Sequence, residues 1–352
     1  MFVIPKTMRA AVYRGPNDLR VETVPVPRIG PGDLLVKVAA CGVCPTDIKK
    51  IQFGTVPPPR IFGHETAGTI VCTGTRVRGF KVGERVALHH HVPCLGCHAC
   101  RHRAFAQCEQ YKRTGITAGF EPAGGGFAEY VRVLPFVLPG VIKIPAKNSF
   151  EEGAMLEPVN TVLKGINRLS LLPGDNVLVA GQGPIGLMFT RLLQLRGMHV
   201  LATDLMESRL KLAKKFGARW ALNPEPNSEF RIPNSALPLS AAVLAVPSGA
   251  AFAQALQLIR GAGRVLLFAH TQRGALTELD LAAICVDEKD LVGSYSADFT
   301  LQREVARLVF SRQLDVRPLI TQRYPLAETA AAVQLAAHPA PDSLKVLVSH
   351  GL

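Results

Sequence analysis

Short apolar runs separated by glycine and proline fill the first 150 residues of the chain. Residues 34–38, 68–71 and 85–88 are such runs, while residues 57–59 (all proline) and 124–126 (all glycine) mark loops. Short strands with a turn signal about every 8–12 residues are typical of a β-barrel or a β-sandwich. The pattern therefore predicts a compact β-rich domain in this part of the chain.

The pattern changes near Glu151, where helix and strand signals begin to alternate. Such alternation is typical of βαβ units that build a parallel sheet, so an α/β domain is predicted. Residues 223–238 contain four prolines and are predicted to form an irregular connection. The apolar periodicity predicts a helix over 185–196 and strands at 176–180, 199–203, 242–246, 264–268, 291–294 and, near the end of the chain, 344–348.

With 352 residues, 48% of them hydrophobic and 19% charged, the chain is long enough for two domains with separate cores. No apolar stretch approaches the ~18 residues of a membrane helix. Residues 1–6 lack the charged and apolar segments that open a signal peptide. We therefore expect a cytoplasmic protein without a membrane partner. In that setting the eight cysteines are metal ligands or buried thiols, not disulfides.

A formal net charge of +13 raises the question of nucleic-acid binding. Basic clusters occur at Arg76 and Arg78, at Arg101 and Arg103, and at Lys112 and Arg113. No aromatic-rich ribbon accompanies them, since the chain has one tryptophan and five tyrosines. A solvated basic surface that also attracts an anionic cofactor is the favoured interpretation, and no nucleic-acid partner is expected.

A glycine motif follows the strand predicted at 176–180. Gly181, Gly183 and Gly186, with Pro184 and Ile185 before the last, match G-x-G-x-x-G between a strand and a helix. The first glycine permits a tight turn, the second lets the backbone approach a pyrophosphate, and the third allows close packing of helix on strand. Because the helix N-terminus attracts phosphates, the motif predicts a dinucleotide site.

Asp204 comes 18 residues after Gly186, at the end of the next predicted strand. A carboxylate there can accept hydrogen bonds from both adenosine ribose hydroxyls and would repel a 2′-phosphate, so it favours NAD over NADP. Arg209 follows within one or two helical turns and is a candidate to flank the adenine ribose. A solvated helix residue is an equally good interpretation of Arg209.

Four cysteines lie close together at Cys94, Cys97, Cys100 and Cys108. Four thiolates at such spacing suit a closed, tetrahedral structural zinc site. A disulfide lattice is the alternative, but the chain offers no secreted context for one.

Cys44, His64 and Glu65 form a second candidate metal set, and Thr46 and Asp47 follow the cysteine. A thiolate, an imidazole and a carboxylate suit a catalytic zinc that keeps one position open. Taken one at a time, a buried thiol and a core histidine are the commoner interpretations. The order of the two metal sets and the glycine motif along one chain favours an enzyme with two zinc ions and a dinucleotide.

These motifs resemble the zinc-dependent medium-chain dehydrogenases, the superfamily of alcohol, sorbitol and threonine dehydrogenases. The resemblance covers almost the whole chain, and Glu157-Pro158 is most similar to the polyol and threonine branch. It implies a GroES-like β-rich catalytic domain formed by 1–155 and 299–352, with a structural zinc lobe at about 89–112. A Rossmann domain at 156–298 with a doubly wound parallel sheet would complete an α/β protein, with the active site in the cleft.

The resemblance also implies a role for each residue of the motifs. Cys44 and His64 would bind the catalytic zinc, with Glu65 or Glu157 completing the set directly or through water. Asp47 would orient His64, and Thr46 would pass the substrate proton. The four cysteines of the lobe would hold the second zinc ion.

One departure from the family concerns the proton relay. Many relatives carry a histidine shortly after the Cys-x-Thr/Ser-Asp motif, where this chain has Lys49 and Lys50. The motif therefore does not identify the residue that passes the proton from the relay to solvent. His89, His90 and His91 are alternatives, although a polar loop is the more common interpretation of such a run.

The function implied is reversible, NAD-dependent oxidation of a small secondary alcohol or polyol by a homodimer or homotetramer. Oxidation of L-threonine or of a phosphorylated polyol is the alternative within the family. From another class, a noncatalytic zinc protein that binds nucleic acid through its basic lobe remains open. A zinc-free quinone reductase of the same fold is disfavoured, because it would not need both metal sets.

Overall fold

The computed structural model describes residues 2–89, 92–110, 124–224, 232–269, 274 and 276–350. The chain forms two compact units. The first comprises Met1–Asn160 and Ser296–Leu352, and the second comprises Thr161–Tyr295. The chain therefore leaves the first unit once and returns to it, so that its two ends belong to one unit.

The first unit contains two sheets that share one apolar core. A three-stranded antiparallel sheet has the order β2-β1-β4, and a seven-stranded sheet has the order β15-β16-β3-β5-β6-β8 with β7 also paired to β3. Its strands are β1 (Thr7–Gly15), β2 (Asp18–Pro25), β3 (Leu34–Gly42), β4 (Arg60–Ile61), β5 (Glu65–Thr73), β6 (Arg85–Ala87), β7 (Tyr130–Val133), β8 (Ile142–Lys143), β15 (Ile320–Pro325) and β16 (Lys345–Ser349).

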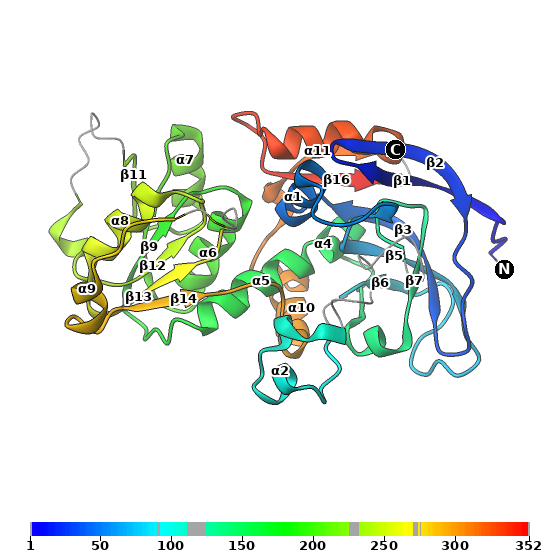
Figure 1. The fold of residues 1–352 in the computed structure, drawn as a ribbon, viewed down its shortest axis with the longest axis horizontal. Helices are drawn as coiled ribbons and strands as arrows, with labels where there is room; N and C mark the ends of the chain where they lie inside the picture. The colour runs from blue at the N-terminus through cyan, green and yellow to red at the C-terminus, as the bar shows by residue number, and fades with distance from the viewer. Residues whose placement is uncertain are drawn as a thin grey trace. The chain divides into compact units, whose positions relative to one another are not determined.

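Strand β16 joins the end of the chain to its beginning. It pairs antiparallel with β3, with Leu347 opposite Gly42 and Val348 opposite Cys41. Figure 1 shows this as a red arrow beside the blue N-terminal strands. Val346 and Val348 enter the same buried cluster as Leu34 and Val36. Burial of these apolar side chains stabilises the first unit only when both chain segments are present.

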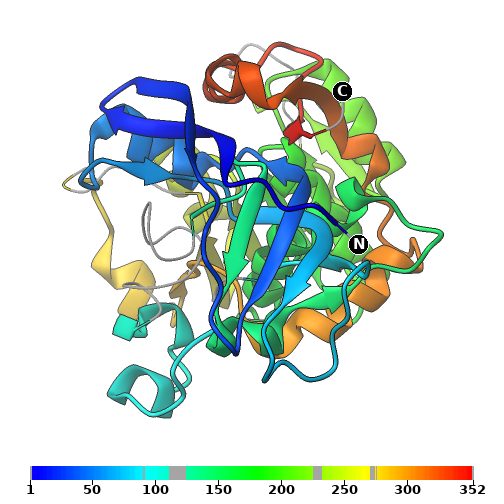
Figure 2. The same cartoon turned by 90° about the vertical axis from the view of Figure 1, so that its right-hand side faces the viewer.

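Short helices connect and flank these strands. In both views the segment that carries α2 projects from the rest of the first unit (Figure 1, Figure 2). The helices are α1 (Pro45–Phe53), α2 (His98–Arg101), α4 (Phe150–Ala154), α5 (Leu156–Asn167), α10 (Gln302–Phe310) and α11 (Thr329–Ala337), with 3-10 turns η1 (Phe105–Gln107), η2 (Pro135–Gly140), η4 (Phe299–Leu301), η5 (Arg317–Leu319) and η6 (Leu326–Glu328).

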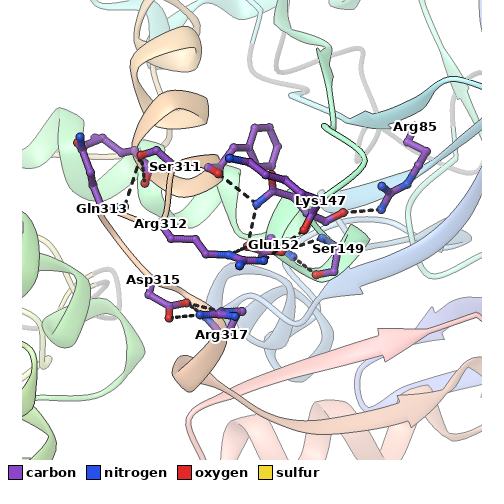
Figure 3. A network of polar contacts seen from close by, with 12 residues as sticks. Arg85, Lys147, Ser149, Glu152, Ser311, Arg312, Gln313, Asp315 and Arg317 are labelled. Carbon is purple, nitrogen blue, oxygen red and sulfur yellow. Dashed lines mark hydrogen bonds and ion pairs between the residues drawn. The ribbon is translucent and has the colours of Figure 1, made fainter.

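A polar network fastens the returning segment to helix α4 (Figure 3). Ser149 and Glu152 form a reciprocal capping box at the start of α4. The Glu152 carboxylate also accepts a hydrogen bond from Arg312 Nε at 3.0 Å, and Arg312 Nη2 donates to the Lys147 carbonyl at 3.2 Å. Since α5 follows α4 directly, this network helps to hold the start of α5 in place.

The second unit contains one parallel sheet of six strands in the order β11-β10-β9-β12-β13-β14. The alternating pattern predicts the parallel sheet, and the strand order is that of the doubly wound Rossmann domain implied by the family resemblance. Its strands are β9 (Asn176–Ala180), β10 (His199–Thr203), β11 (Trp220–Leu222), β12 (Leu239–Leu244), β13 (Ile259–Leu267) and β14 (Asp290–Gly293). Its helices are α6 (Pro184–Leu195), α7 (Glu207–Lys215), α8 (Gly249–Leu258) and α9 (Leu281–Cys285), with a 3-10 turn η3 (Asn234–Ala236).

The sequence places β9 and β10 correctly to the residue, because a continuous apolar run forms the middle of each strand. The prediction for β12 is displaced: the strand begins at Leu239, which pairs with Ile259, instead of at residue 242. Polar Ser240 interrupts the apolar run there, so only the pairing with β13 reveals the start of the strand. Among the described residues, no helix is long and apolar enough to cross a membrane.

Candidate active site and metal centres

Cys44 lies between strand β3 and helix α1 and caps the helix. Its Sγ accepts a hydrogen bond from the Thr46 N–H at 3.5 Å, Pro45 occupies the first turn, and Gly54 ends the helix in the left-handed region. The cap therefore fixes the thiol at the helix N-terminus. Thr46 lies two residues further along and is half-buried.

His64 and Glu65 come from the start of β5, which pairs with the end of β3. Register places Glu65 opposite Gly42, two residues before Cys44. One ligand atom from each of Cys44, His64 and Glu65 lies within 4.8 Å of the others. Zinc bonds of about 2.0–2.3 Å in a tetrahedron place ligand atoms about 3.3–3.8 Å apart, which lies within this limit. The predicted set is therefore assembled, and its donor types and spacing fit zinc.

Asp47 lies behind the histidine. Its Oδ2 is 3.1 Å from His64 Nδ1, and both side chains are buried. This contact fixes the ring orientation, as the outer partner of a metal-binding histidine does. Burial lowers the pKa of His64, but the negative charges of Asp47 and Cys44 outweigh it and raise that pKa well above its ordinary value. The negative charges of Asp47 and Cys44 thus favour positive charge at this position.

Glu157 lies in the first turn of α5 and is 4% exposed. Burial raises its pKa to about 7; the nearby charge of Glu65 adds to this effect and that of His64 opposes it. Glu157 therefore lies near the metal set. The carboxylate within 4.8 Å of the Cys44 and His64 ligand atoms is that of Glu65.

Lys345 is a site residue that the sequence motifs do not reveal. It begins strand β16, is 5% exposed, and forms an ion pair with the Glu65 carboxylate. Its Nζ also donates to the Val43 carbonyl at 3.0 Å. Burial lowers the pKa of Lys345, but Glu65 and Cys44 outweigh it and raise that pKa, so the ammonium stays charged. The only sign of this role in the sequence is that Lys345 is a single charged residue in the mostly apolar strand near the end of the chain.

Gly42 makes room for this buried ion pair. A Cβ atom at position 42 would overlap the Glu65 carboxylate and crowd the Lys345 side chain. Glycine is therefore required here by close approach, not by its backbone angles.

The four cysteines of the lobe also come together. Sγ of Cys100 lies 3.5 Å from Sγ of Cys97 and 3.9 Å from Sγ of Cys94. Zinc–sulfur bonds of about 2.3 Å in a tetrahedron place sulfur atoms about 3.8 Å apart, so the set fits a structural zinc. All eight cysteines are free thiols, and the disulfide alternative is wrong. Backbone N–H groups lower the pKa of Cys94 and Cys97, which favours the thiolate form.

The glycine motif connects β9 to α6 as expected. Gly181 adopts φ 90°, and a Cβ at Gly186 would overlap the Gly181 carbonyl, so helix and strand approach closely. Gly183 caps α6, with Pro184 and Ile185 in its first turn, and a Cβ at Gly183 would meet open space. The free N–H groups at this helix start can therefore receive a phosphate.

Asp204 follows β10 and is 8% exposed. Its two oxygens accept hydrogen bonds from the N–H groups of Gln182 at 2.7 Å and Met206 at 2.9 Å. These contacts hold the carboxylate beside the glycine motif, with further lone pairs for a ligand. Arg209 Nη1 lies 3.9 Å from Asp204 Oδ2, which places the guanidinium beside the carboxylate.

The remaining candidates are dispersed. His89 is buried, while His90 and His91 lie outside the described residues. Arg76, Arg78, Arg101 and Arg103 are exposed, and Lys112 and Arg113 also lie outside the described residues.

Two family models match the chain. The alcohol dehydrogenase GroES-like domain matches residues 30–146, and the zinc-binding dehydrogenase domain matches residues 184–311. A sorbitol dehydrogenase of Bacillus subtilis is 30% identical over 98% of both chains. An L-threonine 3-dehydrogenase of Symbiobacterium thermophilum is 32% identical over 94% of this chain and 95% of its own.

A solved structure supports the same assignment. A short chain alcohol dehydrogenase of Escherichia coli CFT073, complexed with NADH, has a TM-score of 0.86 and 26% identity over 98% of this chain and all of its own. Such full-length similarity shows that the chain belongs to the zinc-binding dehydrogenases of the medium-chain type, a family of NAD-linked alcohol oxidoreductases.

Proposed function

We propose that this protein oxidises a secondary hydroxyl group of a polyol, reversibly, with NAD as the hydride acceptor. The observation that carries the proposal is the convergence of Cys44, His64 and Glu65, with Glu157 beside them. The full-length similarity to a sorbitol dehydrogenase supports polyols as the substrate class.

Each residue has a role that follows from its position. When bound, zinc supplies a Lewis acid for the alcohol or carbonyl oxygen, and NAD supplies the hydride acceptor. Cys44, His64 and Glu65 would hold the ion, Asp47 orients the His64 ring, and Lys345 orients the Glu65 carboxylate. Glu157 would complete the site directly or through water.

Thr46 is the proposed relay for the hydroxyl proton, because its hydroxyl can accept that proton while it donates its own to the next group. It lies in the first turn of α1, next to the zinc ligand Cys44. Lys49 lies one turn after Thr46, and burial lowers its pKa. Lys49 is therefore our candidate for passing the proton onward.

NAD would bind with its pyrophosphate at Gly181, Gly183 and Gly186 and its adenosine ribose at Asp204, flanked by Arg209. The Asp204 carboxylate supports NAD over NADP, because it would repel a 2′-phosphate.

A substrate panel tests the proposal. Purified zinc-loaded protein is assayed with sorbitol, xylitol, L-threonine and a sorbitol phosphate, each with NAD and with NADP, by the appearance of the reduced cofactor. We expect the highest kcat/KM with a neutral polyol and NAD. Preference for L-threonine or for the phosphorylated polyol would instead support the alternative within the family, which the threonine dehydrogenase relative favours.

Metal analysis with matched cysteine variants tests the site. We expect about two zinc ions per chain in the wild type, from the two ligand sets. Cys44→Ser should abolish turnover and lose one zinc ion, whereas Cys285→Ser, at an exposed cysteine outside both sets, should change neither. If the wild type held only one zinc ion per chain, either the catalytic or the structural zinc site would be wrongly assigned.

A noncatalytic nucleic-acid-binding zinc protein is the candidate from another class. It would form no NADH from any alcohol and would bind DNA with an affinity that falls steeply with salt. The exposed arginines are compatible with it, but the assembled catalytic set favours the enzyme.

We also propose a homodimer that joins the edges of two parallel sheets, with a homotetramer as the larger alternative. Strand β14 ends the sheet, and exposed apolar side chains lie on it and on nearby segments: Leu267, Leu276, Leu281, Val286 and Leu291. Leu291→Lys should reduce the mass measured by light scattering to that of one chain. An unchanged mass would place the interface elsewhere.

The cytoplasm is the proposed location. The two thiolate-containing sets need reduced cysteines, and all eight cysteines are free thiols.

A further inference from the structure

Helix α5 begins directly after α4, and the Val159 N–H donates to the Met155 carbonyl at 3.2 Å where the two helices meet. Glu157 lies in this first turn, where Pro158 has no N–H to donate. Contacts of this turn with other segments therefore contribute to the position of the Glu157 carboxyl group.

Asn160 supplies such a contact three residues later, on the same face of the helix. It is fully buried, and its Nδ2 donates to the Asp298 carbonyl at 2.9 Å and to Gln302 Oε1 at 3.0 Å. The Asp298 N–H donates in return to Asn160 Oδ1 at 2.8 Å. The carboxamide thus forms a paired amide contact with the main chain of Asp298.

The segment that Asn160 contacts is itself held by the four-cysteine lobe. Asp298 caps the turn η4 by accepting a hydrogen bond from the Thr300 N–H at 2.9 Å. The Phe299 ring in η4 meets the Phe105 ring of the lobe edge to face, with centroids 5.4 Å apart. Phe105 also packs against the cysteine cluster. Contacts within the first unit therefore run from the lobe to Glu157.

We propose that Asn160 is a positioning residue for the catalytic metal site. It fixes the first turn of α5 on the Asp298–Gln302 segment and so holds Glu157 beside the metal set. The Phe105–Phe299 contact makes the four-cysteine lobe a support of the same segment. This inference rests on the proposed function only in that Glu157 acts at a bound metal ion.

A double-mutant cycle on zinc release tests the inference. The zinc-loaded wild type, Asn160→Ala, Glu157→Gln and the double variant are mixed with a coloured chelator, and the release rate of each zinc ion is recorded without substrate. We expect Asn160→Ala to speed release of the catalytic zinc roughly tenfold or more, because loss of an outer-shell partner typically costs about 10–100-fold in metal affinity. In the Glu157→Gln background the same substitution should have little effect.

Two further variants keep the test decisive. Asn167→Ala, an asparagine at the other end of α5 whose Oδ1 accepts from Arg196, is the matched control and should release zinc like the wild type. Phe105→Leu keeps an apolar side chain and should act in the same direction as Asn160→Ala, again only when Glu157 is present. It also serves if Asn160→Ala does not fold.

An equal effect of Asn160→Ala with and without the Glu157 carboxylate would overturn the inference, since Asn160 would then act independently of it. A Glu157→Gln variant with wild-type zinc release would overturn it as well. Failure of the proposed function would be seen in a different experiment, because the wild type would then oxidise no polyol. The zinc-release rates could still be measured, since they need no substrate.

Discussion

Removal of the Lys345 ammonium should destabilise the protein far more than removal of a similar surface charge. Lys345 is 5% exposed and Glu65 is 1% exposed, so Lys345→Met leaves a carboxylate buried without its cation. Breaking a buried pair in this way costs about 3–5 kcal/mol. Bound zinc compensates part of the Glu65 charge, so the lower value, about 3 kcal/mol, applies to the zinc-loaded protein.

Thermal unfolding followed by circular dichroism measures this cost. For a unit of this size, each kcal/mol lowers Tm by about 2–4 °C, so Lys345→Met should lower Tm by roughly 6–12 °C. The matched control is Lys143→Met. Lys143 also pairs with a glutamate, Glu84, at 2.6 Å, but the two side chains are 53% and 26% exposed. An exposed pair is worth about 0–1 kcal/mol, so this variant should unfold within a few degrees of the wild type.

The double variant Lys345→Met/Glu65→Gln adds a second check. Loss of both charges removes the unpaired carboxylate, so part of the stability lost in Lys345→Met should return. If Lys345→Met and Lys143→Met lowered Tm equally and by only a few degrees, the buried ion pair would not hold Glu65, and the reasoning would be refuted.

Three further predictions concern a glycine, the cofactor carboxylate and a histidine. Gly42→Ala should expel the Glu65 carboxylate from its place, leaving about one zinc ion per chain and little turnover. Asp204→Ser should lower the ratio of kcat/KM with NAD to that with NADP by roughly tenfold or more, because a ribose contact and the repulsion of a 2′-phosphate are both lost. Burial lowers the pKa of His350 to about 4. The unfolded chain therefore binds a proton at higher pH than the folded one, and stability should fall by up to about 3 kcal/mol as pH drops from about 6.5 to 4.

Each of these has a simple control or contrary outcome. Gly15→Ala, where an added Cβ meets nothing within 4 Å, should keep both zinc ions. Unchanged cofactor selectivity in Asp204→Ser would mean that the aspartate serves only the Gln182 and Met206 N–H groups. His350→Leu should flatten the acid limb of the unfolding free energy measured in urea, and an identical limb in both proteins would assign the loss to other groups.

Much of the site could be predicted from sequence because its parts are local. The four cysteines fall within 15 residues, and the lobe needs only short turns to bring their sulfur atoms to tetrahedral spacing. The glycine motif is likewise one strand, one turn and one helix, and β9 and α6 begin and end within a residue of their predicted limits. Cys44, His64 and Glu65 were identified from motif order, but their convergence required the pairing of β3 with β5.

Other features depended on contacts between distant segments, which no local pattern encodes. Lys345 is 280 residues from Glu65, and it reaches the site only because β16 pairs with β3. Asn160 reads as an ordinary helix residue until the returning chain places Asp298 against it. The sequence by itself determined which residue types could bind zinc and dinucleotide, because that chemistry belongs to the side chains and their local spacing. The tertiary structure decided which buried charges and amides support them, because burial and long-range pairing exist only in the folded chain.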